Sequence, residues 1–177
     1  MLTDKENVGL QSAIDVSESF DESSLCASNL TSLSLSMNDS ITNRTIRSLP
    51  FITDLDLSAN ITIYQQLPVS LRRLDLSSND IYTDDMISHL SNLEYLSLYN
   101  NDLVTDNVLS TLVSLTSLCI HTNMVITDAG VSTLTNLTMI DLRCNTKVSA
   151  ECIKKMNIPY VMFGDYVIHG IPPQFVG

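Results

Sequence analysis

The sequence predicts an α/β solenoid, in which short parallel strands stack into a sheet of about eight strands and short helices or extended segments cover the other side. The first observation is a nine-residue sequence motif. Counted from its first residue as offset 0, it has aliphatic residues at offsets 0, 3 and 5 and asparagine at offset 8. It occurs six times, for example as LTSLSLSMN from Leu30 and LRRLDLSSN from Leu71. The second observation is the period, because these copies start 19 or 22 residues apart. Self-similarity at such a period is typical of solenoids.

Two weaker copies flank the six and extend the repeat array to residues 11–166. QSAIDVSES from Gln11 has serine at offset 8, and IPYVMFGDY from Ile158 has tyrosine there. The predicted repeats therefore start at residues 11, 30, 52, 71, 93, 115, 137 and 158.

The segments outside the array are predicted to differ in structure. Residues 1–10 carry a capping box from Thr3 to Glu6, so we expect an N-terminal capping helix over the first turn of the stack. Residues 167–177 contain two prolines and no repeat pattern, which predicts an irregular C-terminal tail.

Each position of the motif has a physical reason. Residues at offsets 3 and 5 lie on one face of a strand and point inward, while those at offsets 2, 4 and 6 point to solvent. A strand that buries one face in this way must stack on similar neighbours to complete its core. Where the chain turns away from the strand, backbone N–H and C=O groups would be buried without partners, which is costly. An asparagine side chain offers both a donor and an acceptor, so we expect it to satisfy each turn.

The rest of each 22-residue unit predicts a short helix. The segments YTDDMISHLSN, VTDNVLSTLVS and ITDAGVSTLTN share a Thr-Asp start, at Thr83, Thr105 and Thr127. We expect the threonine to cap the helix and the aspartate to face the positive end of the helix dipole. The segment ITIYQQLPVS, residues 61–70, contains Pro68 and is too short for a full helix, which predicts an extended or 3₁₀ conformation.

Composition limits the partners and the compartment. The net charge of −11 repels nucleic acid and anionic membranes, and favours a basic or neutral partner. No stretch is long enough to span a membrane, and the amino end lacks a signal peptide pattern. The four cysteines have no metal-ligand spacing, so reduced thiols and no metal or cofactor are expected. Glycosylation sequons at Asn38 and Asn60 fall on asparagines that the fold should bury, which predicts a cytoplasmic location.

The motif LxxLxLxxN at this spacing resembles the leucine-rich-repeat family over residues 11–166. LPVSLRRLDLSSNDI is similar to the short repeats of bacterial leucine-rich effectors and surface proteins, and the ITDAG units look like longer repeats of cysteine-containing and bacterial proteins. The resemblance implies a curved horseshoe whose concave sheet binds other macromolecules. The sequence departs from typical members in lacking a cysteine-rich cap, a transmembrane or F-box-like segment, and an appended catalytic domain.

On the concave face, the register predicts a binding surface in the carboxyl half. The amino half presents small polar residues, mostly serine, whereas the carboxyl half gathers aromatic and charged side chains. Tyrosine and arginine are common hot-spot residues at interfaces. The expected partner-binding residues are Tyr95, Tyr99, His121, Met139, Asp141, Arg143 and Tyr160.

Two other groups of residues on this face have simpler explanations than a metal site or an active site. Three aspartates on neighbouring strands could hold Ca²⁺, but Arg73 stands beside Asp54 and is the simpler partner. The three aspartates are Asp54, Asp56 and Asp75. Cys119 and His121, with Asp141 on the next strand, supply the residues of a thiol nucleophile, a base and an orienting group. Neither a helix terminus nor a glycine loop supports that chemistry, so no enzyme is expected.

The sequence therefore predicts a non-enzymatic, monomeric protein-interaction module, either a bacterial effector delivered to a host cell or an intracellular adaptor. The alternative from another class is a structural scaffold segment of a larger array, and a thiol enzyme that uses Cys119 and His121 is the weakest reading.

Overall fold

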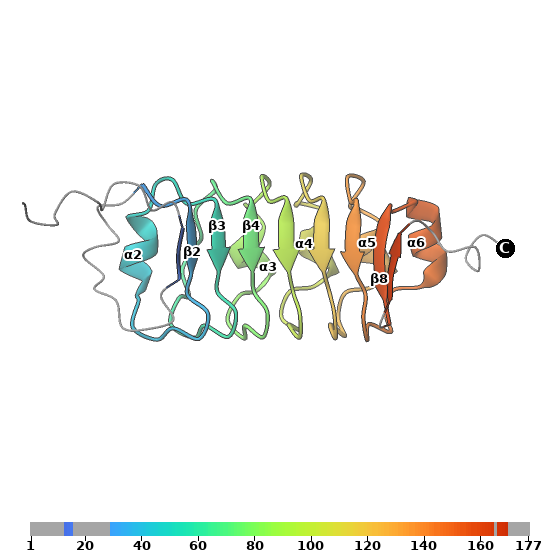
Figure 1. The fold of residues 1–177 in the computed structure, drawn as a ribbon, viewed down its shortest axis with the longest axis horizontal. Coiled ribbons are helices and arrows are strands. Elements are labelled where there is room, and N and C mark those ends of the chain that lie inside the picture. Colours follow the sequence, from blue (N-terminus) through green and yellow to red (C-terminus); the bar gives the residue numbers. More distant parts are fainter. Residues whose placement is uncertain (1–12, 16–28, 165, 170–177) are drawn as a thin grey trace, which may run out of the picture.

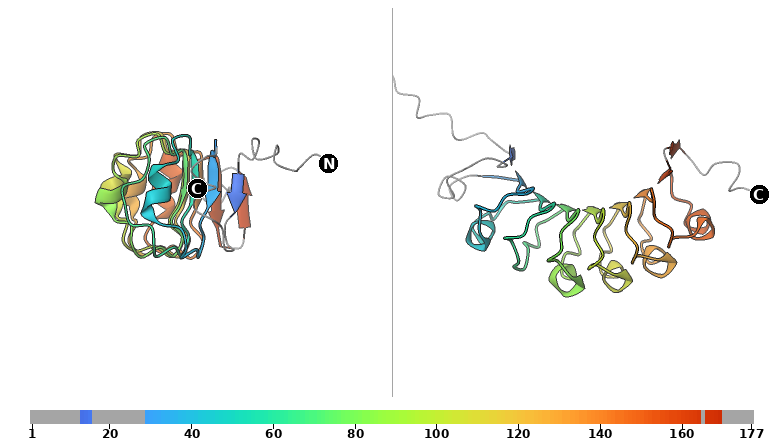
Figure 2. Two further views of the ribbon diagram at one scale, coloured as in Figure 1. Left: turned by 90° about the vertical axis from the view of Figure 1, so that its left-hand side faces the viewer. Right: turned by 90° about the horizontal axis from the view of Figure 1, so that it is seen from below.

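Nine short strands lie side by side in chain order and form one curved sheet, with helices on its outer side (Figures 1 and 2). The computed structural model of the protein describes residues 13–15, 29–164 and 166–169. The strands are β1 (Ala13–Asp15), β2 (Ser32–Ser34), β3 (Asp54–Asp56), β4 (Arg73–Asp75), β5 (Tyr95–Ser97), β6 (Ser117–Cys119), β7 (Met139–Asp141), β8 (Tyr160–Phe163) and β9 (Tyr166–His169). The helices are α2 (Asn43–Arg47), α3 (Asp84–Ile87), α4 (Asp106–Leu109), α5 (Asp128–Val131) and α6 (Ala150–Met156). The sheet lines the concave side of the curve, as the right-hand view of Figure 2 shows.

The first eight strands are parallel, and their register follows the sequence repeat. Each strand pairs with the next through offsets 2, 3 and 4, so that Arg73 lies opposite Tyr95 and Leu74 opposite Leu96. The predicted solenoid with about eight parallel strands is therefore confirmed. Among the described residues, no helix is long and apolar enough to cross a membrane.

The sequence does not predict the ninth strand. β9 pairs antiparallel with β8, with Phe163 opposite Tyr166, after a turn at Gly164 where φ is 61°. The prediction of an irregular tail from residue 167 is therefore wrong for residues 167–169. A hairpin needs only a tight turn, which a glycine with positive φ provides, so it leaves no mark on the repeat pattern. The predicted capping helix at residues 1–10 lies outside the described residues.

Aliphatic side chains at offsets 0, 3 and 5 form one continuous core between the sheet and the convex segments. In the repeat that starts at residue 71, Leu74 and Leu76 are completely buried. The strands are too short to build a core alone, so stability comes from stacking on neighbouring repeats. The last repeat departs from the pattern, because Val161 is buried whereas Phe163, which the register places inward, is 44% exposed. Phe163 stands at the turn into β9, where the parallel stacking stops.

The buried asparagines at offset 8 join each repeat to the one before it. Asn101 Nδ2 donates to the backbone carbonyls of Leu76 at 3.2 Å and Asn79 at 2.7 Å. Oδ1 of the same side chain accepts from the backbone N–H groups of Leu103 and Val104, both at 3.1 Å. The predicted role of the asparagine is therefore confirmed. The same arrangement recurs at Asn60, Asn79 and Asn145.

The asparagines at offset 8 form a ladder along the stack of repeats. Two of these ladder asparagines are also glycosylation sequons, and both are buried as predicted. Asn38 is 6% exposed and Asn60 is completely buried. Asn60 Nδ2 donates to the Asn38 carbonyl at 2.7 Å, so a glycan on its side chain would replace a bond inside the stack. Neither site is compatible with a glycan in the folded chain.

The residue before each ladder asparagine has a left-handed backbone, with φ between 49° and 55°. These residues are Met37, Ala59, Ser78, Asn100, Thr122 and Cys144. This conformation is costly for a β-branched side chain and much less so for asparagine.

Thr122→Asn is expected to raise the free energy of unfolding by about 0.5–1 kcal/mol, because it relieves this backbone strain. Asn100 already occupies the equivalent position one repeat earlier. Urea unfolding of the two proteins tests the expectation. A loss of stability would mean that the bond from Thr122 Oγ1 to the His121 carbonyl, at 2.7 Å, outweighs the strain.

The aspartates in the first helical turns form a second link between repeats, which the sequence does not predict. The Asp84 carboxylate accepts from the backbone N–H of Thr105 at 2.7 Å and from its hydroxyl at 2.5 Å. Thr105 and Thr127 also cap their own helices as predicted, whereas Thr83 makes no side-chain cap bond. The aspartates therefore bind the next repeat in addition to facing the helix dipole. Equivalent bonds join Asp106 to Thr127 and Asp128 to Ser149.

Among the repeats that the structure describes in full, one has no helix on its convex side. Residues 61–70 run extended past α2, as their length and Pro68 predict. Side chains of the next repeat donate to three of its backbone carbonyls, which a helix would otherwise satisfy. Tyr82, completely buried, stands where the other described repeats have isoleucine or valine, and its larger ring helps to fill the space under this segment. The three bonds are Tyr82 Oη to Gln65 (3.1 Å), His89 Nε2 to Leu67 (2.8 Å) and Asn92 Nδ2 to Val69 (3.1 Å).

Candidate binding surface on the concave sheet

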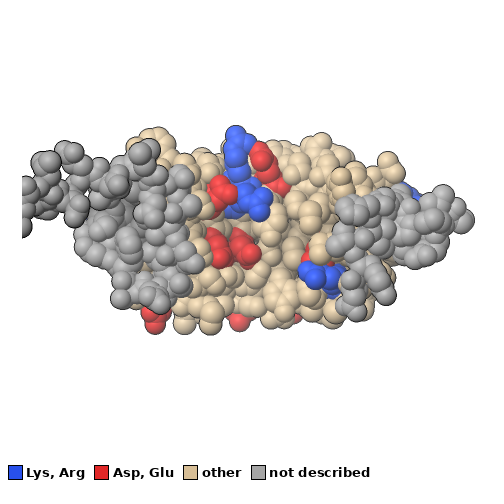
Figure 3. Space-filling view, viewed as in Figure 1, with Lys and Arg blue, Asp and Glu red and all other residues tan. Residues whose placement is uncertain are grey.

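The seven side chains that the sequence assigns to partner binding all lie in the carboxyl half of the concave sheet. Figure 3 shows this face of the molecule, on which basic side chains lie beside acidic ones and large areas carry no charge. The parallel register brings together residues of four successive repeats, although they are far apart in the sequence. They are Tyr95 in β5, Tyr99 after β5, His121 after β6, Met139 and Asp141 in β7, Arg143 after β7, and Tyr160 in β8.

Tyr99 and His121 form a ring pair at the carboxyl ends of β5 and β6. Their ring centroids are 4.8 Å apart and the planes are inclined by 58°. Tyr99 is 40% exposed. A tilted pair at this distance is a favourable aromatic geometry, and each ring keeps a polar group available for hydrogen bonding. The pair therefore presents contact area with few rotatable bonds.

Asp141 holds Arg143 in position instead of facing solvent, so the prediction that it is exposed is wrong. Its side chain is nearly buried, and Arg143 Nε donates to both carboxylate oxygens, at 3.0 and 3.1 Å. A terminal nitrogen of Arg143 donates to Oδ2 at 2.7 Å. Burial alone would raise the pKa of Asp141, but the hydrogen bonds from Arg143 lower it on balance, so the carboxylate is charged at neutral pH. The guanidinium is thereby fixed in one orientation on the surface.

Arg73 belongs to this surface, although it is absent from the predicted set. Its guanidinium carbon lies 4.2 Å from the centroid of the Tyr95 ring, a cation–π contact. Arg73 Nε also lies 3.3 Å from Asp54 Oδ1, which confirms the predicted ion pair. Burial raises the pKa of Tyr95, so its phenol stays neutral. The sequence could have predicted this contact, because Arg73 and Tyr95 share offset 2 on neighbouring strands.

Met139 and Tyr160 form the apolar end of the surface. They lie opposite each other on β7 and β8 and are 39% and 49% exposed. Ser117 separates Met139 from Tyr95 in the same column, so the surface consists of two groups and not of one unbroken aromatic strip.

Small polar side chains between these groups pair with one another. Ser97, which the register predicts to face solvent, is only 3% exposed, and its Oγ lies 2.8 Å from Ser77 Oγ. On the amino half, Ser34 Oγ donates to Asp56 at 2.9 Å and Ser58 Oγ donates to Ser36 at 2.7 Å. These short bonded residues leave few free donors for a ligand.

Cys119 lacks the features of an activated thiol. Burial is the main cause that raises its pKa above that of a free thiol, so it stays protonated at neutral pH. Its Sγ lies 3.7 Å from Asp141 Oδ2, while the His121 ring packs against Tyr99. The geometry therefore gives no support to the cysteine–histidine mechanism considered from the sequence.

Comparisons with known proteins identify only structural relatives. No family model and no curated protein matches the chain significantly. Internalin C2 from Listeria monocytogenes has 29% identity and a TM-score of 0.58, over 76% of this chain and 61% of its own. The protein TLR13, in a complex with ssRNA13, has 18% identity and a TM-score of 0.64, over 86% of this chain and 29% of its own. Rad7, in a complex with Elc1 in yeast, has 19% identity and a TM-score of 0.54, over 71% of this chain and 39% of its own.

Proposed function

We propose that this chain, a leucine-rich-repeat protein, binds another protein through the carboxyl half of its concave sheet. The observation that carries the proposal is the exposed ring pair of Tyr99 and His121 beside Arg143, whose guanidinium is fixed by Asp141. Rigid rings and an oriented guanidinium are the side chains that dominate interface energies. Tyr95 with Arg73, and Met139 with Tyr160, extend the contact area on either side.

A protein partner fits the charge of the chain better than a nucleic acid does. TLR13 is described in complex with RNA and Rad7 in complex with a protein, but both likenesses are below 20% identity and support the fold alone. The net charge of −11 opposes a phosphate backbone, because nucleic-acid binding depends on basic groups. Three of the five described arginines are also already paired with carboxylates.

The role that fits best is a non-enzymatic interaction module, either a bacterial effector or an intracellular adaptor. The likeness to internalin C2 supports a bacterial source, although the chain spans only about three fifths of that protein. The burial of Asn38 and Asn60 supports a compartment without N-glycosylation, either the cytoplasm of the producing cell or that of a host. The partly buried, protonated thiol of Cys119 supports binding over thiol catalysis.

The double variant Tyr95→Ala, Tyr99→Ala tests the surface directly. It should weaken partner binding by about 2 kcal/mol or more, roughly thirtyfold in Kd, if the rings are hot spots. The variant should keep its fold, because neither ring lies in the repeat core. Partners are first captured with the intact chain and identified by quantitative mass spectrometry, and the affinity of each is then measured by calorimetry with both proteins.

The matched control is Tyr64→Ala, which removes a tyrosine that is 65% exposed in the segment 61–70. Ser34→Arg with Ser36→Arg probes the equivalent positions on the amino half. If the serine variant abolishes binding and the tyrosine variant does not, the partner binds the amino half of the sheet and the proposed location is wrong. If neither alters capture of any protein, the sheet is a scaffold and the proposal fails.

A further inference from the structure

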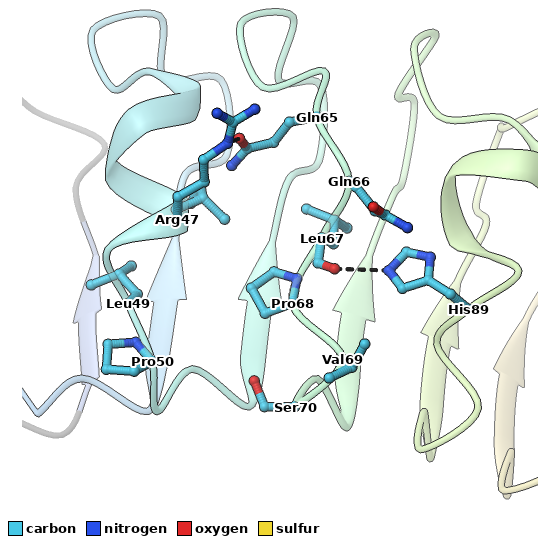
Figure 4. A pocket seen from close by; sticks show the side chains of 11 residues that line it. Arg47, Leu49, Pro50, Gln65, Gln66, Leu67, Pro68, Val69, Ser70 and His89 are labelled. Atoms are coloured by element: carbon cyan, nitrogen blue, oxygen red, sulfur yellow. Dashed lines mark hydrogen bonds between the residues drawn. The ribbon is translucent and has the colours of Figure 1, made fainter.

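The segment without a helix leaves a groove on the convex side, far from the concave surface. The groove has a volume of about 490 Å³ and lies between α2, the segment 65–70 and His89 of the next repeat (Figure 4). This is the size of a site for a small ligand or a short peptide stretch. Its walls are largely apolar and come from Ile46, Leu49, Pro50, Leu67, Pro68 and Val69.

One wall of the groove carries a buried amide whose nitrogen has no partner. Gln65 is only 7% exposed, and its Oε1 accepts from Arg47 Nε at 2.6 Å. Its Nε2 has no hydrogen-bond partner among the described residues. Figure 4 shows the amide beside Arg47, with its nitrogen on the side that faces Leu49 and Pro68. Buried donors without an acceptor are rare and costly, so this one points to an acceptor from outside the chain.

The backbone around this amide is held rigidly. The carbonyls of Gln65, Leu67 and Val69 are all bound by side chains of the next repeat, as described above. The unpaired nitrogen therefore cannot be explained by a loose loop. A backbone held in this way is preorganised, so binding to it costs little ordering of the main chain.

The fully charged side chain that lines the groove is the basic Arg47, whereas the chain as a whole has a net charge of −11. Arg72, Arg73 and Arg143 form ion pairs with carboxylates. The two remaining described arginines, Arg44 and Arg47, are both on α2 and have no ion pair among the described residues. Arg47 uses Nε for Gln65, which leaves its two terminal nitrogens for a ligand. An anionic acceptor therefore suits this end of the groove better than a neutral one.

We propose that this groove binds an extended peptide segment of a partner protein that presents a carboxylate beside an apolar side chain. The carboxylate accepts from Gln65 Nε2 and from the Arg47 guanidinium, and the apolar side chain packs on Leu49, Pro50 and Pro68. A small rotation of the Gln65 amide brings its nitrogen to the ligand. This site is independent of the concave surface.

Chemical-shift titration of the intact, ¹⁵N-labelled chain tests the site. The probe is N-acetyl-L-leucine, which joins a carboxylate, an apolar side chain and an amide. It should shift the Gln65 side-chain amide resonance and the backbone resonances of 65–70 at millimolar concentration. N-acetyl-L-leucinamide, which lacks the charge, should bind about tenfold more weakly, and inorganic phosphate should not produce these shifts. Equal shifts with phosphate, or none at Gln65 with the leucine probe, would overturn the proposal.

Three variants separate ligand binding from a purely structural role. Gln65→Leu and Arg47→Met should each weaken binding of the leucine probe about tenfold, while Asn107→Leu, which replaces an exposed amide on α4 outside the groove, should leave it unchanged. Gln65→Leu should also melt at the same or a higher temperature, because it removes an unpaired buried donor. A marked fall in melting temperature would show that Gln65 serves the fold alone. The double variant Tyr95→Ala, Tyr99→Ala should not alter this titration. A negative titration would therefore count against the groove and not against the concave surface.

Discussion

Replacing Asn101 by alanine should lower the free energy of unfolding by about 3 kcal/mol or more. The change leaves four backbone groups of two adjacent repeats without their partners, three of them in buried bonds, and each buried loss costs about 1 kcal/mol or more. The damage falls in the middle of the array, where every repeat depends on its neighbours. Equilibrium denaturation in urea measures the effect.

The matched control is Asn107→Ala, which removes an exposed asparagine on α4. It should change stability by less than about 0.5 kcal/mol, because surface substitutions away from special features are nearly neutral. Equal stability of the Asn101 and Asn107 variants would contradict the role assigned to the asparagine ladder.

Gly130→Ala should lower the free energy of unfolding by about 2 kcal/mol, although alanine is the better helix former. A Cβ at residue 130 would lie only 2.9 Å from Asp106 Cα and closer still to its carboxylate. It would push α5 away from α4 and disturb the bonds from Asp106 to Thr127. Thermal melts monitored by circular dichroism provide the measurement.

A neighbouring substitution separates this packing effect from helix propensity. Ala129→Gly, on the exposed side of the same helix, should destabilise by about 1 kcal/mol through propensity alone. If propensity governed both positions, Gly130→Ala would stabilise the chain, and that result would refute the close approach of α5 to α4.

The strands, the core and the asparagine ladder could be predicted from the sequence because each depends on a pattern that the repeat restates. Offset positions fix which face of a strand a side chain occupies, and six copies of an asparagine leave one structural role for it. The aspartate links were not predicted, because a Thr-Asp pair has a sufficient local explanation at a helix start. Only the spatial stacking shows that Asp84 reaches Thr105 of the next repeat.

The candidate surface was predicted in outline but not in its contacts. Residues at the same offset in successive repeats lie side by side, which places Tyr99 beside His121 and Arg73 beside Tyr95. Both pairs are in contact. Exposure was harder to predict, because a face that points to solvent can still be covered by neighbouring side chains. Asp141 is buried in this way by its bonds to Arg143, and no alternation rule reports such local cover.

The repeat without a helix also has a mechanical consequence. A helix is about 10 Å wide, whereas strands are spaced about 4.8 Å apart. The helices therefore space the repeats further apart on the convex side than the strands do on the concave side, and this difference curves the array. The repeat with residues 61–70 has no such helix between α2 and α3, while α3, α4 and α5 pack side by side. Under a bending load this joint relies on the side-chain bonds from Tyr82, His89 and Asn92 to the carbonyls of the segment, because no helix packing supports it. The carboxyl arm, which bears the candidate concave surface, is therefore coupled to the amino arm through these few bonds, and a ligand in the groove would add contacts across the same joint.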